Sequence, residues 1–355
     1  MKIAVAMSGG VDSSATLALL KEQGHDLVGL TLRVLPCTAG DSGDPRLCCT
    51  TRDIEDARGV ALALGVPHYV CEGLDLFEEK VVTPFLDEYE RGLTPNPCVE
   101  CNRHAKLPAL LREALALGCE KLATGHYARL DPAGSGGRWI LRKARDAQKD
   151  QSYFLYRSTQ GMLSRLLFPL GDLTKEEVRD VARRQALSVA EKKESMEVCF
   201  TGGRDYRDFV KERRPRAFKP GPIVDVSGRE VGRHEGLAGF TVGQRRGMGL
   251  SGGPWFVVEL RPETATLVVG TEEDTHSPDF RVGELVWSAW DGLVGPREAQ
   301  VKVRYRAEDS PATLDPAGDG RVRVVPKKPL GSVTPGQSAV FYEGDAVVGG
   351  GIIQK

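Results

Sequence analysis

The sequence lacks the features that would place it in a membrane or give it a strong overall charge. It contains no apolar run of the about 18 residues that a membrane-spanning helix requires. Its first residues, MKIAVAMSGG, reach a glycine pair before they reach the length of a signal peptide. The 48 Lys and Arg residues are balanced by 49 Asp and Glu residues, so any basic surface for a nucleic acid must be local. We therefore expect a cytoplasmic protein with no membrane partner.

Two common phosphate-binding patterns are also absent. The sequence contains neither G-x-x-x-x-G-K-[ST] nor G-x-G-x-x-G, which argues against a kinase-type P-loop and against a Rossmann dinucleotide fingerprint. No internal repeat or low-complexity segment is visible. Since cytoplasmic thiols stay reduced, the eight cysteines are expected to be catalytic, metal-binding or buried rather than joined in structural disulfides.

The pattern of residues 1–130 alternates between strands and helices. Buried strands are expected at KIAVAM, DLVGLTLRVL, PHYVC and KLATGHYA, with helices between them at about 13–23, 53–64, 76–92 and 102–117. Such alternation predicts βαβ units, and hence an α/β fold with a doubly wound parallel sheet. Thr50 with Asp53, and Thr174 with Glu177, resemble capping boxes that begin two helices.

The pattern changes after about Gly203. Residues 204–219 contain seven Lys or Arg against three acidic residues, and short strand-like runs such as GPIVDV and WFVVEL follow. From about Asp279 onward the sequence consists of strands and turns. We therefore predict three domains: an α/β domain at 1–203, a small central domain at 204–276 and a C-terminal β-barrel at 277–355.

The stretch AMSGGVDSS joins the first expected strand to the first expected helix. At this place in a parallel sheet, backbone N–H groups and a helix N-terminus form an anion site. Gly9 and Gly10 allow close approach of phosphate oxygens, the loop serines offer hydroxyl donors, and Asp12 could hold a magnesium ion. The alternative is a tight strand–helix turn that binds nothing.

Several motifs together resemble one known family. SGGVDS resembles the pyrophosphate loop of the adenine-nucleotide hydrolase (PP-loop) superfamily, whose members split ATP to AMP and pyrophosphate while they adenylate a substrate. The motifs that narrow the resemblance are TPNPCVECN, ATGHYAR, KDQSYFL, MEVCF, GQRRG, VRYR and PGQSAVFY. In order and spacing they are similar to those of the tRNA-specific 2-thiouridylases (MnmA or TrmU family), over nearly the whole chain.

This resemblance implies an ATP-pyrophosphatase domain, a tRNA-contacting central domain and a C-terminal β-barrel. It implies that C2 of the wobble uridine in the tRNA anticodon arm receives sulfur after ATP activates the C2 oxygen. The implied site for ATP with Mg²⁺ comprises Ala6, Met7, Ser8, Gly9, Gly10, Val11, Asp12, Ser13, Leu32 and Gly125. Without the resemblance, Leu32 would be taken for a core residue.

The resemblance also implies a set of tRNA contacts. They fall at Asn96, Pro97, Cys98, His126, Lys149, Asp150, Gln151, Arg304, Tyr305 and Gln337, the first three being at the target base. The basic run 204–219 is a further candidate for contacts with RNA phosphates, and a solvated helix is the alternative reading of it.

Sulfur transfer needs a nucleophilic thiol. Thiolates form more readily near helix N-termini and cations, and Cys101 precedes an expected helix that carries Arg103, His104 and Lys106. By the resemblance Cys101 is the nucleophile and Cys199 carries the persulfide. Taken alone, either cysteine would be interpreted as a small buried hydrophobic residue.

Position 98 departs from the more familiar family pattern, which has Asp where this chain has Cys98. Three thiolates, Cys98, Cys101 and Cys199, could hold a 4Fe–4S cluster with one open iron. The other possibility is a persulfide on Cys199 and a closing disulfide, with Cys98 as a bystander or resolving thiol. Structural zinc would need a fourth ligand, and none is obvious.

The other cysteines and the partners complete the expectations. Cys37, Cys48 and Cys49 lie in a long loop, while Cys71 and Cys119 are expected in the core. A sulfur-donor protein, such as a cysteine desulfurase or a sulfur relay protein, is the implied partner besides tRNA. Two rival functions are an amidotransferase-type synthetase and a non-catalytic tRNA- or zinc-binding protein. The missing glutaminase domain argues against the first, and the intact SGGVDS loop argues against the second.

Overall fold

The computed structural model describes residues 1–35, 51–133, 137–193 and 198–355. These residues form two compact units. The first unit comprises Met1–Val82, Pro97–Gly203 and Asp345–Val347, and the second comprises Thr83–Asn96, Arg204–Gly344 and Val348–Lys355. The segment Thr83–Asn96 therefore belongs to the second unit, although its sequence position lies inside the predicted first domain.

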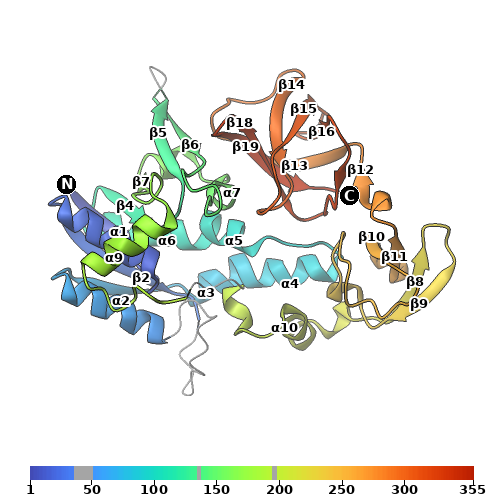
Figure 1. Cartoon of the computed structure of the whole chain (residues 1–355), viewed down its shortest axis with the longest axis horizontal. Coiled ribbons are helices and arrows are strands. Elements are labelled where there is room, and N and C mark those ends of the chain that lie inside the picture. The colour runs from blue at the N-terminus through green and yellow to red at the C-terminus, as the bar shows by residue number, and fades with distance from the viewer. Residues whose placement is uncertain (36–50, 134–136, 194–197) are drawn as a thin grey trace. The chain divides into compact units, whose positions relative to one another are not determined.

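A five-stranded parallel sheet forms the centre of the first unit (Figure 1). Its order is β3-β2-β1-β4-β7, with bounds β1 Lys2–Ala6, β2 Asp26–Arg33, β3 His68–Glu72, β4 Lys121–Thr124 and β7 Leu166–Leu167. All neighbouring pairs are parallel. The chain order reverses between β1 and β4, which is the position where such folds bind ligands. The predicted doubly wound α/β fold is confirmed.

Helices pack on both faces of this sheet, against the buried side chains of its strands. Ile3 and Val5, both fully buried, share one core with apolar residues of α1 (Val11–Glu22), α2 (Thr51–Ala63) and α9 (Lys175–Arg184). Helix α6 (Leu107–Ala116) packs against β1, β2 and β4. Since crossover connections are right-handed, the reversal of strand order puts α6 on the opposite face.

Two helical runs of the chain contain π-helical stretches. One runs through α3 (Leu74–Phe77), η1 (Glu78–Val82) and α4 (Thr83–Glu90), and the other through α5 (Pro97–Glu100), η2 (Cys101–Lys106) and α6. The second helix begins at Pro97, earlier than its predicted start near 102. Proline suits the first helical position, because the N–H that it lacks would have no partner within the helix there.

One of the two predicted capping boxes can be compared with the structure. The Thr174 hydroxyl accepts a hydrogen bond from Glu177 N at 3.3 Å, and the Glu177 carboxylate accepts one from Thr174 N at 2.7 Å. This capping box at the start of α9 is confirmed. Thr50, the first residue of the other box, lies outside the described residues.

The rest of the first unit consists of a hairpin and short helices. Strands β5 (Arg129–Ala133) and β6 (Arg138–Arg142) pair antiparallel, and the guanidinium groups of Arg129 and Arg142 bind the Asp345 carboxylate at 2.7 and 2.6 Å. The short helices are α7 (Ser152–Leu155), α8 (Gln160–Leu163) and the 3₁₀ turn η4 (Cys199–Thr201).

The second unit contains a small sheet and a closed barrel. Helix α10 (Tyr206–Arg213) precedes a four-stranded sheet of order β10-β11-β8-β9, formed by β8 Gly221–Asp225, β9 Glu230–His234, β10 Phe256–Arg261 and β11 Thr266–Gly270. Short strands β12 (His276–Ser277) and β17 (Leu330–Gly331) pair with each other.

The barrel has the order β13-β16-β15-β14-β18-β19 and closes through pairing of β13 with β19. Its strands are β13 Phe280–Trp287, β14 Arg297–Lys302, β15 Ser310–Pro316, β16 Val322–Pro326, β18 Ser338–Glu343 and β19 Ala346–Ile353. Alternate residues such as Val322 and Val324 point into its core. The predicted C-terminal β-barrel is confirmed. Across the described ranges of the chain, no helix has the length and apolar character needed to cross a membrane.

Candidate functional site

The glycine loop leaves the carboxyl end of β1 and turns directly into α1. Gly9 has φ +71°, and a Cβ atom there would lie 2.2 Å from the Asp53 carbonyl oxygen, so only glycine fits. Gly10 precedes α1, and no side chain caps this helix end. The first N–H groups of a helix have no intrahelical partner, which makes this end suited to binding an anion.

Serine side chains hold the shape of the loop. Ser8 N donates a hydrogen bond to Ser13 Oγ at 3.1 Å, and Ser13 Oγ donates to the Gly10 carbonyl at 3.1 Å. The Ser8 and Ser13 hydroxyl oxygens lie 3.3 Å apart. Because these bonds cross the turn between β1 and α1, the loop is shaped before any ligand binds.

The other predicted ATP residues lie at the same edge of the sheet. Gly125 follows β4, and a Cβ atom there would be 2.8 Å from Ser13 N, so the backbone after β4 touches the start of α1. Leu32 is buried near the carboxyl end of β2 and packs against Gly73. The structure therefore brings the sequence-predicted ATP residues to the carboxyl ends of β1, β2 and β4.

Asp12, predicted to hold magnesium, is bound by two side chains that the sequence analysis did not single out. Its carboxylate accepts hydrogen bonds from Tyr127 Oη at 2.7 Å and from Lys175 Nζ at 2.7 and 2.9 Å. Lys175 is the first residue of α9, where a cation is unfavourable next to the helix dipole unless an anion compensates it. The only sequence signal for Lys175 was its place directly after the capping Thr174.

Lys192 ties the glycine loop to α2. Its ammonium donates hydrogen bonds to the Gly9 carbonyl at 3.0 Å, to Asp53 Oδ1 at 2.7 Å and to Asp56 Oδ2 at 2.5 Å. Burial alone would lower the pKa of Lys192, but the two carboxylates outweigh it and raise the pKa above its ordinary value. Lys192 was not predicted from the sequence, because a lysine within a charged run such as EKKE is normally exposed to solvent.

The two candidate catalytic cysteines lie in elements that share a neighbour. Cys101 is half-buried at the start of η2, and Cys199 is half-buried at the start of η4. Helix α3 contacts η2, and its Phe77 ring meets Phe200 edge to face with centroids 5.8 Å apart. The elements that carry Cys101 and Cys199 therefore both contact α3, whereas Cys98 is exposed on α5.

The charges near Cys101 are partly engaged with other residues. Glu100 accepts a hydrogen bond from the buried Arg157 at 2.7 Å, and His104 Nε2 lies 3.5 Å from the other Glu100 oxygen. Lys106 Nζ lies 3.3 Å from His126 Nε2. Cys101 also sits inside a continuous helical run rather than before its start, which differs from the predicted setting of this thiol.

His126 occupies a half-buried, polar position after β4. Its Nδ1 lies 2.8 Å from the Thr124 hydroxyl oxygen. Burial and, secondarily, the positive charge of Lys106 hold the pKa of His126 well below its usual range. His126 is therefore neutral near pH 7 and suited to hydrogen bonding rather than to pairing with phosphate.

Two of the neighbouring predicted tRNA residues, Asp150 and Gln151, accept hydrogen bonds from nearby backbone N–H groups. Buried Asp150 accepts hydrogen bonds from Ala144 N and from the Ser152 backbone and hydroxyl. Gln151 Oε1 accepts one from Tyr127 N at 3.0 Å. Lys149 is half-buried.

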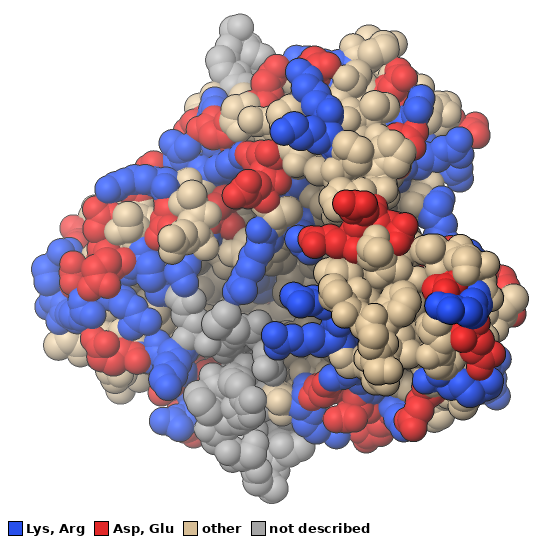
Figure 2. Space-filling model, turned by 45° about the vertical axis from the view of Figure 1, so that its right-hand side comes forward, with Lys and Arg blue, Asp and Glu red and all other residues tan. Residues whose placement is uncertain are grey.

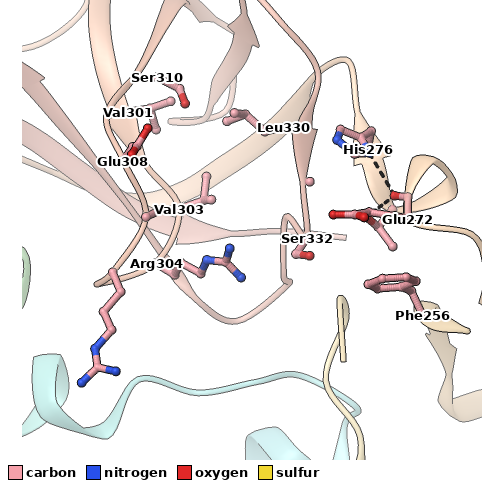
Figure 3. Close-up of a pocket in the computed structure, with 14 residues that line it drawn as sticks. Phe256, Glu272, His276, Val301, Val303, Arg304, Glu308, Ser310, Leu330 and Ser332 are labelled. Carbon is pink, nitrogen blue, oxygen red and sulfur yellow. Dashed lines mark hydrogen bonds between the residues drawn. The ribbon is translucent and has the colours of Figure 1, made fainter. Parts of the chain in front are cut away.

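The remaining predicted tRNA residues belong to the second unit. Arg304 is exposed and lines a cavity of about 400 Å³ together with Phe256, His276 and Ser332 (Figure 3). Tyr305 is half-buried. Gln337 donates both hydrogen bonds of its amide nitrogen to backbone carbonyls, those of Thr94 and Pro95, at 3.0 Å each.

On the face of the molecule in Figure 2, acidic and basic side chains are intermixed. Within the basic run 204–219, Arg204 pairs with Glu212 at 3.1 Å, Arg214 pairs with Asp87 at 3.0 Å, and Arg207 pairs with Asp205. Part of the predicted phosphate-binding charge is therefore already compensated.

The candidate cluster ligands do not form a metal site in this structure. Among the residues that the structure describes, no three His, Cys, Asp or Glu side chains are arranged to hold a metal ion. Cys98, Cys101 and Cys199 are all among those residues, so they do not fit as a ligand set as they stand. Cys37, Cys48 and Cys49 lie outside the described residues.

Comparisons with known proteins agree with the fold and the motifs. Family models match residues 1–203 ("tRNA methyl transferase HUP domain"), 207–271 ("tRNA methyl transferase PRC-barrel domain") and 277–353 ("Aminomethyltransferase beta-barrel domain"). The tRNA-specific 2-thiouridylase MnmA of Carboxydothermus hydrogenoformans is 47% identical over 356 residues, covering 100% of this chain and 98% of that protein. The proteins of the same name from Desulforamulus reducens (44% over 356 residues; 100% and 97% covered) and Moorella thermoacetica (46% over 352 residues; 99% and 99% covered) are similar over nearly their whole length. The chain therefore belongs to the MnmA family of tRNA-specific 2-thiouridylases.

Proposed function

We propose that this chain uses ATP to replace the C2 oxygen of the wobble uridine in tRNA with sulfur. The observation that carries the proposal is the glycine loop between β1 and α1, where Gly9 and Gly125 permit backbone approaches that no other residue allows. The names of the relatives, tRNA-specific 2-thiouridylase, supply the substrate class and the product. Cys101 and Cys199, in two elements that both contact α3, supply the thiols.

The first step activates the base. A uracil C2 oxygen is a poor leaving group, and its attack on the α-phosphate of ATP converts it to an adenylate with release of pyrophosphate. The N-terminus of α1 and the loop backbone bind the pyrophosphate, which they stabilise by fixed dipoles. Asp12 offers carboxylate oxygens that suit Mg²⁺, which would neutralise phosphate charge. Lys175, bound to Asp12 at 2.7 Å, adds a positive charge at the same place.

The second step transfers sulfur. The terminal sulfur of a Cys199 persulfide attacks C2 of the adenylated uridine, and AMP leaves with the former C2 oxygen. The Cys101 thiolate then attacks Cys199 Sγ, which forms a Cys101–Cys199 disulfide and leaves sulfur on C2. A thiol reductant restores the two cysteines, and a sulfur-donor protein such as a cysteine desulfurase or a relay protein reloads Cys199.

We favour this cysteine-only route over an iron–sulfur route. The three cysteines that would hold a 4Fe–4S cluster do not fit as a ligand set within the described residues. On this route the first cysteine of the Cys-x-x-Cys pair, Cys98, is a contact for the target base. It does not carry the sulfur atom that is transferred to the uridine. We further propose that the reaction takes place in the cytoplasm, and we retain 1–203, 204–276 and 277–355 as the domain boundaries.

A direct assay tests the proposed function. Purified protein is incubated with ATP, a persulfide donor, a thiol reductant and a tRNA transcript with a wobble uridine. Nucleoside mass spectrometry should detect 2-thiouridine, and AMP and pyrophosphate should form only when that tRNA is present. Asp12→Ala should abolish both, whereas Asp26→Ala, on the exposed amino end of β2, should not. Thiolation without ATP, or ATP cleavage without dependence on tRNA, would contradict the proposal.

Substitution at position 98 separates the two sulfur routes. Cys98→Asp introduces the more familiar family residue and removes one candidate cluster ligand. On the cysteine-only route we expect thiolation within about threefold of the unchanged protein, since a polar contact is exchanged for another. Anaerobically purified protein should contain no iron or acid-labile sulfide. Loss of thiolation in Cys98→Asp together with loss of bound iron would show that a cluster is required.

A further inference from the structure

The chain neighbours of Cys101 on both sides are bound by one short segment of the first unit. Cys101 lies in the helical run 97–106, here called the thiol helix, between Glu100 and Asn102. The elements α5 and η2 of this helix both contact α7, and Arg157 follows the end of α7 by two residues (Figure 1). All of these elements belong to the first unit.

Two hydrogen bonds join the segment to the thiol helix. Arg157 Nη1 donates to Glu100 Oε1 at 2.7 Å, and the two side chains are 4% and 24% exposed. Asn102, which is itself buried, donates from Nδ2 to the Phe154 carbonyl at 3.2 Å. Because a charged hydrogen bond is stronger when it is shielded from water, the contact at Glu100 constrains the helix more than a surface ion pair would.

The segment that makes these contacts is itself firmly held. Tyr153, Leu155 and Tyr156 are at most 1% exposed. At the start of α7, the Asp150 carboxylate accepts hydrogen bonds from the Ser152 N–H group at 3.2 Å and from its hydroxyl at 2.9 Å. Closely packed side chains have few alternative positions. The segment is therefore a rigid support for the thiol helix.

We propose that Arg157 is a positioning residue for the Cys101 thiol. Its hydrogen bond to Glu100 holds the thiol helix so that Cys101 reaches Cys199 in the second half of the proposed sulfur transfer. In that step the Cys101 thiolate attacks Cys199 Sγ and forms a disulfide with it. The bond between Cys199 Sγ and the sulfur on C2 of the base breaks, and that sulfur leaves as the product thiolate. The functional part of this inference rests on the proposed thiolation, whereas the accessibility of Cys101 can be measured without it.

A misplaced Cys101 thiol has a specific chemical signature. The tRNA stays joined to Cys199 through the sulfur on C2, and this covalent adduct is resolved only when an added thiol attacks it. A residue that only stabilises the fold would lower the amount of folded protein but would not trap the adduct. The adduct therefore separates a positioning role from a structural one.

Three variants disturb the contacts of the thiol helix, and a fourth is the control. Arg157→Met removes the charge and the hydrogen bond but keeps an apolar stem, and Arg157→Lys restores a cation. Asn102→Ala breaks the other contact, so that the inference stays testable if Arg157→Met does not fold. Arg112→Met is the matched control, because Arg112 binds Glu113 at 3.0 Å but is 69% exposed on α6. All are made in the full chain, and circular dichroism and thermal unfolding identify the variants that fold.

Two measurements are made on each folded variant. The first is the rate at which iodoacetamide alkylates Cys101 relative to Cys71 of β3, with tandem mass spectrometry to distinguish the label on Cys101 from that on Cys98. The second is single-turnover thiolation by persulfide-loaded protein with ATP and tRNA but without reductant. Non-reducing denaturing gels detect the adduct in this reaction, and nucleoside mass spectrometry detects the released 2-thiouridine.

Arg157→Met and Asn102→Ala should both show the signature. The relative alkylation rate of Cys101 should change several-fold, and the adduct should accumulate and then disappear when dithiothreitol is added. The rate of product formation without reductant should fall by about tenfold to a hundredfold, while the Kd for tRNA stays within about twofold. Arg157→Lys should lie between Arg157→Met and the unchanged protein, and Arg112→Met should match the unchanged protein.

The absence of the adduct would overturn the inference. If the unchanged protein thiolates tRNA and folded Arg157→Met and Asn102→Ala proteins release the product without a trapped adduct, the contacts of the thiol helix serve stability only. An equal amount of adduct in Arg112→Met would have the same meaning. If the unchanged protein does not thiolate tRNA at all, the proposed function fails, but the alkylation rates still decide whether Arg157 positions Cys101.

Discussion

At the scale of single residues, Lys192 has a structural role that comes entirely from its tertiary contacts. Its ammonium contacts the Gly9 carbonyl and two carboxylates that are themselves largely shielded, with side-chain exposures of 10% for Asp53 and 28% for Asp56. The three donors of the ammonium match these three acceptors. We infer that Lys192 holds the glycine loop in the shape that binds pyrophosphate.

Replacement of Lys192 by Met should therefore damage both stability and ATP use. The change leaves Asp53 and Asp56 near each other without their shared cation, which we expect to lower the free energy of unfolding by about 1–3 kcal/mol. The KM for ATP should rise by about tenfold, because the Gly9 carbonyl loses its partner. Denaturant unfolding and steady-state kinetics measure the two effects. The exposed neighbour Lys193 provides the control, and an equal effect of Lys193→Met would refute the role of Lys192.

His126 makes stability depend on pH in a defined direction. Burial and Lys106 keep the pKa of the folded histidine well below 6.5, so the unfolded chain binds a proton more readily. The stability that comes from neutral His126 is complete above about pH 6.5 and is lost as pH falls toward the folded pKa. The free energy of unfolding of His126→Asn should depend less on pH between about 6.5 and 5. Equal pH slopes in urea titrations of both proteins would contradict this assignment.

At the scale of elements, the glycine loop shows how a short turn is fixed by a neighbouring helix. Gly9→Ala has two costs: the positive φ, about 1 kcal/mol, and a Cβ atom 2.2 Å from the Asp53 carbonyl oxygen of α2. Gly24→Ala is a matched control, since Gly24 has φ +78° but no atom within 4 Å of its Cβ position. We expect loss of tRNA-dependent ATP cleavage in Gly9→Ala and near-normal cleavage in Gly24→Ala. Equal destabilisation of both proteins would mean that contact with α2 is unimportant.

The elements were largely predictable, and the contacts between them were not. Alternating apolar runs and helix-breaking glycines predict the strands and helices of the parallel sheet, because both signals are local in sequence. The start at Pro97 was missed, since a four-residue helix is too short to show an apolar periodicity of its own. Lys175 and Lys192 were missed for another reason: a lysine becomes a structural residue only when folding brings carboxylates to it.

At the scale of the whole molecule, segments that are distant in sequence form contacts that local sequence patterns do not predict. The Gln337 amide contacts residues 242 and 243 positions earlier in the chain. The motif PGQSAVFY was recognised as a family feature, but its contact with Thr94 and Pro95 required the fold. The resemblance could supply the names of site residues, whereas the structure separates those at the glycine loop from those that support neighbouring backbone, such as Asp150.

The salt dependence of tRNA binding tests the proposed role of the basic run 204–219. With a net charge of −1, the chain must rely on local cations. The phosphate contacts that we expect within the run are its exposed cations Lys211, Arg213, Arg216 and Lys219. Each phosphate contact adds about 0.7–0.9 to the slope of log K against log salt concentration. Replacing these four by Ala should therefore lower that slope by about 2–4 and weaken binding, with little change in kcat at saturating tRNA.

The comparison set replaces four exposed cations outside the run: Arg229, Arg233, Arg321 and Lys328. Filter binding at several salt concentrations measures both slopes, and equal losses in the two proteins would assign tRNA binding to diffuse charge rather than to this segment.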